Sequence, residues 1–279
     1  MNVHGIWVGL LLTAAAAHGQ ERLHFDSMSH NPAVRFVYPD TATDTYLRTL
    51  RREHALDTLV GPTSSDIATA LRVVQWTHRA WRHNGSNEPS RSDALTILRE
   101  AKEGRTFRCV EYARVSTDAL LALGLKARVL ALKTKDAAQR RSGAGHVLTE
   151  VWLPSRQKWA LADAQFNLMP FLDGTPLNAV ELQQALASQR LVLFQNADGP
   201  VGESRARRYI RFITDYLYFF DVTFDQRPVV AVQPFKVGDD SALMLVPQGV
   251  APPALFQQRF PLDYILATHA LRDFYQPPR

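Results

Sequence analysis

The amino-acid sequence predicts an α+β fold in which N-terminal helices pack on an antiparallel β-sheet. Helical periodicity occurs in the first half of the chain, in residues 65–82 and again from Phe107 to Gly124. Two strand-like runs follow, residues 146–152 and 159–163. The polar segment between these runs contains Pro154 and predicts a hairpin turn, so the two strands are expected to pair antiparallel.

The predicted helices begin and end at recognisable positions. Residues 84–89 contain glycine and proline and predict a loop after the first helix. Residues 93–103 predict a short helix that leads into the helical run around Cys109, and Gly124 closes that run. The first helix carries an apolar stripe at helical spacing, formed by Ile67, Leu71, Val74 and then Ala80 or Trp81.

The rest of the chain is expected to support this core. Residues 133–145 are polar and end in Ser-Gly-Ala-Gly, which predicts a mobile loop at the border of a cleft. Pro252-Pro253 breaks the chain, but no linker separates a second domain. Further elements are expected as a helix at 180–188, strands at 191–194, 229–235 and 242–246, an aromatic-rich helix or strand at 204–220, and an element of undecided type at 262–275.

Three residues in the middle of the sequence have side chains that can act together in catalysis. Cys109, the only cysteine, opens a helical run, His146 opens the first strand, and Asp163 lies near the end of the second. A thiol, an imidazole and a carboxylate can supply a nucleophile, its base and the group that orients the base. A lone cysteine is otherwise most often an inert buried residue, and the order and spacing of the three residues favour the functional interpretation.

The predicted position of Cys109 suits a nucleophile. The N-terminus of a helix is the positive end of its dipole, and a neighbouring imidazolium adds positive charge, so both favour the reactive thiolate. Backbone N–H groups at the start of the same helix are one source of donors for an oxyanion. A side-chain donor from Gln75, Trp76 or Trp81 is another, and the sequence does not choose among these three.

Strand alternation places His146 and Asp163 on one face of the predicted hairpin. If the two residues face each other directly, Glu150 pairs with Trp159. A register shifted by two residues puts His146 diagonal to Asp163, which is still within reach. Glu150 shares the face of His146 and is the only rival acid on this hairpin.

The residues around this set resemble the core of the transglutaminase-like superfamily, from Gly104 to about Asn167. Three blocks carry the resemblance, and they look like the family's cysteine helix with its following strand, its histidine strand and its aspartate strand. The blocks are Arg108-Cys109-Val110-Glu111-Tyr112-Ala113 continuing through Gly124 to Ala127-Arg128-Val129, Gly145-His146-Val147 to Glu150-Val151-Trp152, and Lys158-Trp159 to Phe166-Asn167.

The resemblance implies a papain/transglutaminase-like core at about residues 62–175, within a single domain at 20–279 that has a family-specific C-terminal extension. It maps Cys109, His146 and Asp163 onto nucleophile, base and orienting acid. It also implies acyl transfer on amide bonds of peptides or proteins, with hydrolysis favoured over cross-linking because no calcium-loop pattern is visible. A non-catalytic binding module on the same fold is the alternative. Arylamine N-acetyltransferases use the same order of the three residues, but the paired glycines usual before their cysteine are absent here.

The N-terminus predicts export. Residues 6–17 form an apolar run that is too short to span a bilayer comfortably. No later segment reaches the length of a membrane span. Ala17-His18-Gly19 is similar to a cleavage site, so residues 1–19 are expected to be a secretory signal peptide. The mature protein would start near Gln20, in the periplasm or outside the cell. An unpaired cysteine in an exported protein is a candidate reactive thiol.

Composition and motifs argue against several other functions. The net charge of +5 comes from scattered spots such as Arg51-Arg52, Arg140-Arg141 and 205–208, which predict solvated surface and not a nucleic-acid site. Cys109, His146 and Asp163 lack the close-spaced pairs and the fourth ligand of a zinc site. No phosphate loop or dinucleotide motif occurs. Neither a metal nor a cofactor is therefore expected, and the sequence carries no information on oligomerisation.

Overall fold

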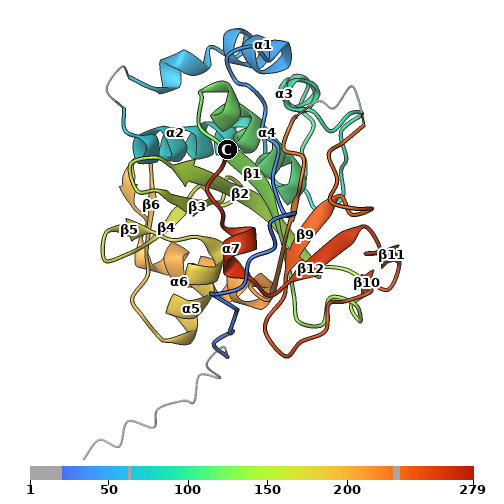
Figure 1. The fold of residues 1–279 in the computed structure, drawn as a ribbon. Coiled ribbons are helices and arrows are strands. Elements are labelled where there is room, and N and C mark those ends of the chain that lie inside the picture. The colour runs from blue at the N-terminus through green and yellow to red at the C-terminus, as the bar shows by residue number, and fades with distance from the viewer. Residues whose placement is uncertain (1–20, 62–63, 229–232) are drawn as a thin grey trace, which may run out of the picture.

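The computed structural model describes residues 21–279, except 62–63 and 229–232. The predicted signal peptide at residues 1–19 lies outside this described part. Two groups of helices cover a six-stranded sheet, one on each side, and a smaller four-stranded sheet lies beside it (Figure 1). This arrangement is a mixed α and β fold, as predicted.

The helices of the N-terminal half form one layer (Figure 1). Asp44, Ser65 and Asp93 cap three of them by accepting a hydrogen bond from a backbone N–H of the first turn. Gly124, at φ 90°, follows the last helix and ends it as the sequence predicts. The predicted helices at 65–82, 93–103 and from Phe107 to Gly124 are confirmed. The elements are α1 (Thr45–Glu53), the 3₁₀ turn η1 (Leu56–Leu59), α2 (Asp66–Ala80), α3 (Ala94–Lys102) and α4 (Cys109–Ala122).

The large sheet has the strand order β12-β9-β8-β1-β2-β3. Its neighbouring strands are antiparallel from β3 to β9, and the last pair, β9 with β12, is parallel. The predicted antiparallel sheet is therefore correct except at this edge. The strands are β1 (Ala127–Lys133), β2 (Gly145–Leu153), β3 (Lys158–Ala162), β8 (Phe219–Thr223), β9 (Ala242–Leu245) and β12 (Ile265–Thr268).

The hairpin of β2 and β3 adopts the shifted register. Glu150 pairs with Leu161, so the direct register that puts Glu150 opposite Trp159 is wrong. A four-residue turn between Leu153 and Lys158 fixes this pairing, and its last residue, Gln157, adopts a left-handed φ of 50°.

The C-terminal part of the chain contains elements that the sequence left undecided. The aromatic-rich segment 204–220 forms α6 (Glu203–Ile213) and the 3₁₀ turn η2 (Thr214–Tyr216) and then enters β8. The segment 262–275 contains β12 and the short helix α7 (Leu271–Phe274). The predicted strand at 229–235 is wrong for its described residues, 233–235, which are in no strand.

Two further predicted elements are present. The helix predicted at 180–188 is α5 (Ala179–Ala187), and the strand predicted at 191–194 occurs two residues later as β6. The smaller sheet has the order β5-β4-β6-β7, and a separate hairpin joins β10 to β11. These strands are β4 (Met169–Leu172), β5 (Thr175–Pro176), β6 (Leu193–Asn196), β7 (Gly199–Pro200), β10 (Leu255–Phe256) and β11 (Phe260–Pro261).

The large sheet buries apolar side chains on both faces. Val151 and Ala160 pack with the layer of α1 to α4. Leu148 and Leu161 point the other way and pack with residues of α5 and α6. Because side chains alternate along a strand, His146 shares the face of Leu148. The sheet therefore presents His146 toward the C-terminal helices.

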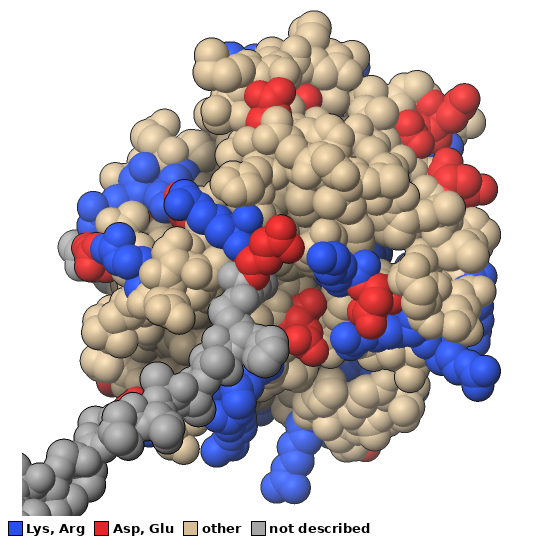
Figure 2. Space-filling model, turned by 90° about the horizontal axis from the view of Figure 1, so that it is seen from below, with Lys and Arg blue, Asp and Glu red and all other residues tan. Residues whose placement is uncertain are grey.

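The charged surface carries both signs. On the face seen in Figure 2, basic and acidic side chains are interspersed and form no single large patch of either sign. Several of the basic residues that stand out in the sequence have acidic partners. The ion pairs are Arg51 with Asp57, Arg140 with Asp136 and Arg207 with Glu203.

No helix in the described part of the chain is long and apolar enough to cross a membrane.

Candidate active site

Cys109 is the first residue of α4, and its side chain is partly accessible. The backbone N–H of Arg108, the residue just before it, donates to Oε2 of Glu111 at 3.0 Å. The Arg108 guanidinium also pairs with Glu111, at 2.8 Å. These contacts fix the first turn of the helix. The first N–H groups of a helix have no partner inside it, so they are available to an anion beside Cys109.

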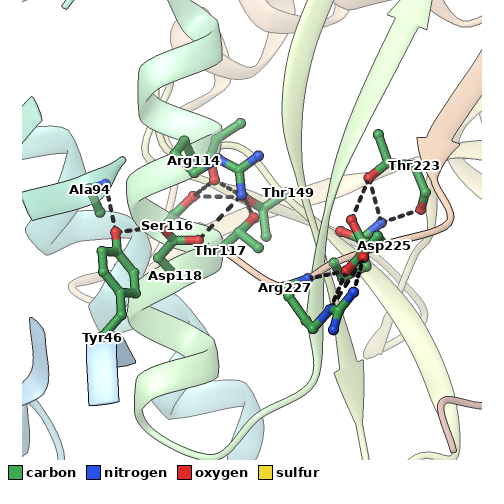
Figure 3. Close-up of polar contacts among 12 residues, drawn as sticks. Tyr46, Ala94, Arg114, Ser116, Thr117, Asp118, Thr149, Thr223, Asp225 and Arg227 are labelled. Atoms are coloured by element: carbon green, nitrogen blue, oxygen red, sulfur yellow. Dashed lines mark hydrogen bonds and ion pairs between the residues drawn. The ribbon is translucent and has the colours of Figure 1, made fainter. Parts of the chain in front are cut away.

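A buried cluster of hydroxyl groups joins the cysteine helix to the histidine strand (Figure 3). Ser116 and Thr117 of α4 lie 2.6 Å and 3.1 Å from the Thr149 hydroxyl of β2. Thr149 also donates to the carbonyl of Ala113 at 3.1 Å. Cys109 lies about one turn before Ala113, and His146 lies shortly before Thr149. The cluster therefore holds Cys109 and His146 at the same end of the sheet.

His146 and Asp163 form a buried pair. His146 Nε2 lies 2.8 Å from Asp163 Oδ2, and the two side chains are 2% and 1% exposed. The structure thus brings the two residues together in the diagonal arrangement that the shifted register allows. Because Nε2 faces Asp163, Nδ1 is the ring nitrogen left for the thiol.

The charge on His146 depends on its two partners. Burial lowers the pKa of His146, but the Asp163 carboxylate and a hydrogen bond with Cys109 outweigh this effect and raise the pKa to about 10. An imidazole in this setting stays protonated at neutral pH and stabilises a thiolate next to it. The three residues can therefore hold a thiolate–imidazolium pair backed by a carboxylate.

Aromatic residues that the sequence did not single out surround His146. The rings of Phe166, Phe212 and Tyr216 have centroids 6.1 Å, 5.1 Å and 5.9 Å from the imidazole. Tyr209 of α6 donates a hydrogen bond to Asp163 Oδ2 at 3.1 Å. The high aromatic content of residues 204–220 was the only feature of the sequence that pointed to the rings of this segment, and it did not indicate which of them face His146.

The loop before β2 borders this site, as predicted. Arg140 of the loop lies 3.9 Å from Asp215 in η2, next to Tyr216. The loop is held from the other side by the β10–β11 hairpin. A Cβ on Gly145, the residue before His146, would lie 2.9 Å from Cζ of Phe256, so only glycine fits there without a shift. The predicted mobility of this loop stays a prediction.

The side chains considered as oxyanion donors have other neighbours. Gln75 donates to Asp198 at 2.6 Å, and the Trp76 ring packs against His54. The Trp81 ring packs in the apolar core between the sheet and the layer of α1 to α4, and its buried indole N–H has no partner among the described residues. No hydrogen bond joins these three side chains to Cys109 among the described residues, and the first backbone N–H groups of α4 lie next to Cys109 in the chain.

His83 is a further residue of this region that the sequence analysis did not mention. Its backbone bridges to Phe107, two residues before Cys109. Burial lowers the pKa of His83, His146 lowers it further, and Asp163 acts in the opposite direction. The exposed His83 imidazole therefore lies within electrostatic range of the buried His146–Asp163 pair.

Glu150, the rival acid, is occupied elsewhere. Its carboxylate accepts from Arg128 at 2.7 Å and from the Tyr275 hydroxyl and the Ala179 N–H, each at 3.1 Å. Both Glu150 and Arg128 are fully buried. Glu150 therefore belongs to a structural ion pair.

Metal ligands are not grouped in the described residues: no three or more histidine, cysteine, aspartate or glutamate side chains are placed to hold an ion.

The geometry predicts how Cys109 reacts with iodoacetamide. The imidazolium of His146 persists up to about pH 10, so the wild-type thiolate is expected to be alkylated nearly as fast at about pH 6 as at about pH 9. In His146→Gln the thiolate loses this partner, and the rate at the lower pH should fall about 100-fold relative to the higher pH, as for an ordinary thiol. Intact-mass spectrometry measures both rates. Labelling of the wild type only in denaturant would contradict the expectation.

Comparison with known proteins places the three residues within one matching segment. Residues 53–164 match the family described as the transglutaminase-like superfamily, and this segment contains Cys109, His146 and Asp163. Among curated proteins, no relative matches.

Solved structures overlap with the chain only in part. A candidate cysteine protease from Cytophaga hutchinsonii is 16% identical, with a TM-score of 0.33, over 47% of this chain and 46% of that one. A structure named as a TGase is 18% identical, with a TM-score of 0.30, over 44% and 31%. An arylamine N-acetyltransferase of Nocardia farcinica is 14% identical, with a TM-score of 0.30, over 71% and 79%. The chain thus spans less than half the length of the first two.

Proposed function

We propose, on the match of residues 53–164 to the transglutaminase-like superfamily, that the protein is a cysteine-dependent acyl-transfer enzyme that hydrolyses amide bonds of peptides or proteins. The observation that carries the proposal is the buried His146–Asp163 pair, at 2.8 Å, in contact with a partly accessible cysteine at a helix N-terminus. In this scheme Cys109 is the nucleophile, His146 the acid and base, and Asp163 the orienting group.

The first half of the reaction forms an acyl-enzyme. The Cys109 thiolate attacks the carbonyl carbon of the amide and forms a C–S bond, and the carbonyl oxygen becomes an oxyanion. Backbone N–H groups at the start of α4 are the donors proposed for this oxyanion. The C–N bond then breaks, His146 gives its proton to the departing nitrogen, and a thioester and a free amine result.

The second half releases the acyl group. Neutral His146 takes a proton from a water molecule, which attacks the thioester carbonyl. The C–S bond breaks, the carboxylic acid leaves, and the thiolate–imidazolium pair is restored. An amine in place of water would give transfer of the acyl group instead, so the same site supports both outcomes and the acceptor decides between them.

An activated ester tests this scheme without knowledge of the natural substrate. Incubation with p-nitrophenyl acetate should give a burst of p-nitrophenolate and a mass increase of one acetyl group on Cys109. Addition of glycine amide should not speed deacylation much if water is the preferred acceptor. A library of peptide amides then identifies the acyl group. Cys109→Ser serves as the control, since it retains the fold and removes the thiolate.

The alternative, a non-catalytic binding module on this fold, gives a different result. Such a protein would bind peptides in the same assay without forming an acetyl-enzyme. The absence of both a burst and a Cys109 adduct in folded wild-type protein would rule out the proposed enzyme and leave the binding module.

We also propose that the enzyme is exported after removal of residues 1–19, on the strength of the apolar run and the Ala17-His18-Gly19 site in the sequence. Sequencing the N-terminus of the periplasmic or secreted protein should find a start near Gln20. A retained Met1 or a cytoplasmic protein would argue against export.

A further inference from the structure

We propose that Tyr209 is a positioning residue of this active site, whose buried hydroxyl holds the Asp163 carboxylate in the orientation that His146 needs. The proposal rests on the proposed function, because it concerns the same catalytic set. It goes further in assigning a role to α6, which follows the family-matching segment in the chain.

Among the described residues the Asp163 carboxylate accepts three hydrogen bonds, and Tyr209 provides one of them. The Tyr209 hydroxyl lies 3.1 Å from Oδ2, the same oxygen that faces His146 Nε2 at 2.8 Å. The backbone N–H of Phe166 donates to the other oxygen, Oδ1, at 3.2 Å. Donors on both oxygens stop the carboxylate from rotating about its last torsion, so Oδ2 stays directed at the imidazole.

Tyr209 acts as a donor in this contact. Burial and the Asp163 carboxylate raise its pKa well above the ordinary value, so the hydroxyl remains protonated. A hydroxyl that donates to a carboxylate stabilises the anion. The Tyr209 hydroxyl therefore helps to keep Oδ2 directed at the imidazole, which carries the proton that the reaction requires.

The surroundings of Tyr209 hold its ring in place. The side chain is 1% exposed, and the ring meets Phe166 and Phe194 edge-on at 5.0 Å and 5.3 Å. One turn earlier in α6, Arg205 donates to the carbonyls of Phe166 and Asn167. These contacts anchor α6 to the loop that follows Asp163, and they hold the Tyr209 hydroxyl next to the Asp163 carboxylate.

The chain contains a matched control for removal of the hydroxyl. Tyr46 also donates from a largely buried hydroxyl to a buried carboxylate, Asp118 Oδ2, at 2.9 Å (Figure 3). Asp118 lies nine residues after Cys109 in the same helix, about 14 Å along its axis. Tyr46→Phe therefore removes the same kind of hydrogen bond away from the active site.

The test compares Tyr209→Phe, Tyr46→Phe and the wild type by the pH profile of Cys109 alkylation with iodoacetamide. In Tyr209→Phe the carboxylate loses the donor that fixes Oδ2 toward His146, so it supports the imidazolium less well. The acid limb of the profile, where the rate falls at low pH, should therefore move to higher pH. The rate at about pH 6 should fall about tenfold, as for loss of a hydrogen bond to a charged group. Tyr46→Phe should follow the wild-type profile even if it is less stable to heat. A Tyr209→Phe profile that coincides with the wild type would overturn the proposal.

A second variant decides the question if Tyr209→Phe does not fold. Replacement of Tyr209 by 3,5-difluorotyrosine keeps the hydroxyl and makes it a stronger donor, so the acid limb should move to lower pH. An unchanged limb would overturn the proposal. Failure of the proposed function looks different, because wild-type Cys109 would then show no acetyl-enzyme and no dependence of its alkylation on His146, whatever residue stands at 209.

Discussion

Replacement of Asp163 by asparagine is expected to lower turnover on the order of 10³-fold while the fold is retained. All three partners of the Asp163 carboxylate are donors, namely His146 Nε2, the Tyr209 hydroxyl and the Phe166 N–H. The asparagine amide group has one acceptor atom only. If its NH₂ group faces His146, the ring must accept at Nε2 and carry its proton on Nδ1, toward the thiol. This tautomer can neither take the thiol proton nor form a stabilised imidazolium.

The acetyl-enzyme burst and the hydrolysis of a peptide amide measure this effect, and circular dichroism shows whether the variant folds. Asp118→Asn is the matched control, because Asp118 is equally buried and also accepts from a tyrosine hydroxyl. Burial raises the pKa of Asp118 to about 6, so loss of its charge should cost little near neutral pH. Full turnover in Asp163→Asn together with an inactive, folded Glu150→Gln would show that the wrong carboxylate had been assigned.

Replacement of Glu150 by glutamine is expected to lower the free energy of unfolding by about 3–5 kcal/mol, because it leaves a buried guanidinium without its counter-ion. Arg128 is fully buried and has Glu150 as its ion-pair partner. The atoms around the Glu150 carboxylate are donors from Arg128, Ala179 and Tyr275. The NH₂ group of a glutamine would therefore face donors on either side.

Chemical denaturation measures the loss, and Glu181→Gln is its control. Glu181 forms an ion pair with Lys158 at 2.7 Å, but its side chain is 38% exposed. A surface pair of this kind contributes about 1 kcal/mol or less. Cys109 in folded Glu150→Gln should be alkylated as in the wild type. Unchanged stability combined with lost reactivity would mean that Glu150 serves the active site and not the ion pair.

The parts of the site that local patterns determine could be predicted from the sequence. The extent of α4 follows from two local signals: helical periodicity predicts the helical run that Cys109 opens, and the glycine at 124 marks its end. The shared side of His146 and Asp163 follows from strand alternation, which is the same in both registers considered. The register itself depends on how many residues the turn contains, and the sequence of residues 153–158 allowed more than one turn.

Contacts between distant segments could not be predicted in this way. Tyr209 reaches Asp163 because α6 packs across the sheet, and nothing in the order of aromatic residues from 204 to 220 indicates which ring does so. The smaller sheet consists of strands of two to four residues, which are too short to show a period. The Phe256 ring of β10 lies against Gly145 at the start of β2, which is far from it in the sequence. Such contacts depend on the complete fold.

The position of α6 in the chain also determines when the surroundings of His146 are completed during synthesis. Proteins are made from the N-terminus, so Cys109, His146 and Asp163 leave the ribosome before Tyr209, Phe212 and Tyr216. A nascent chain that ends at Asn167 contains Asp163 but lacks the Phe212 and Tyr216 rings near His146 and the Tyr209 hydroxyl that donates to Asp163. Its imidazole would be open to water on the side that these rings cover. The surroundings of His146 and Asp163 are therefore complete only after α6 and η2 have been made.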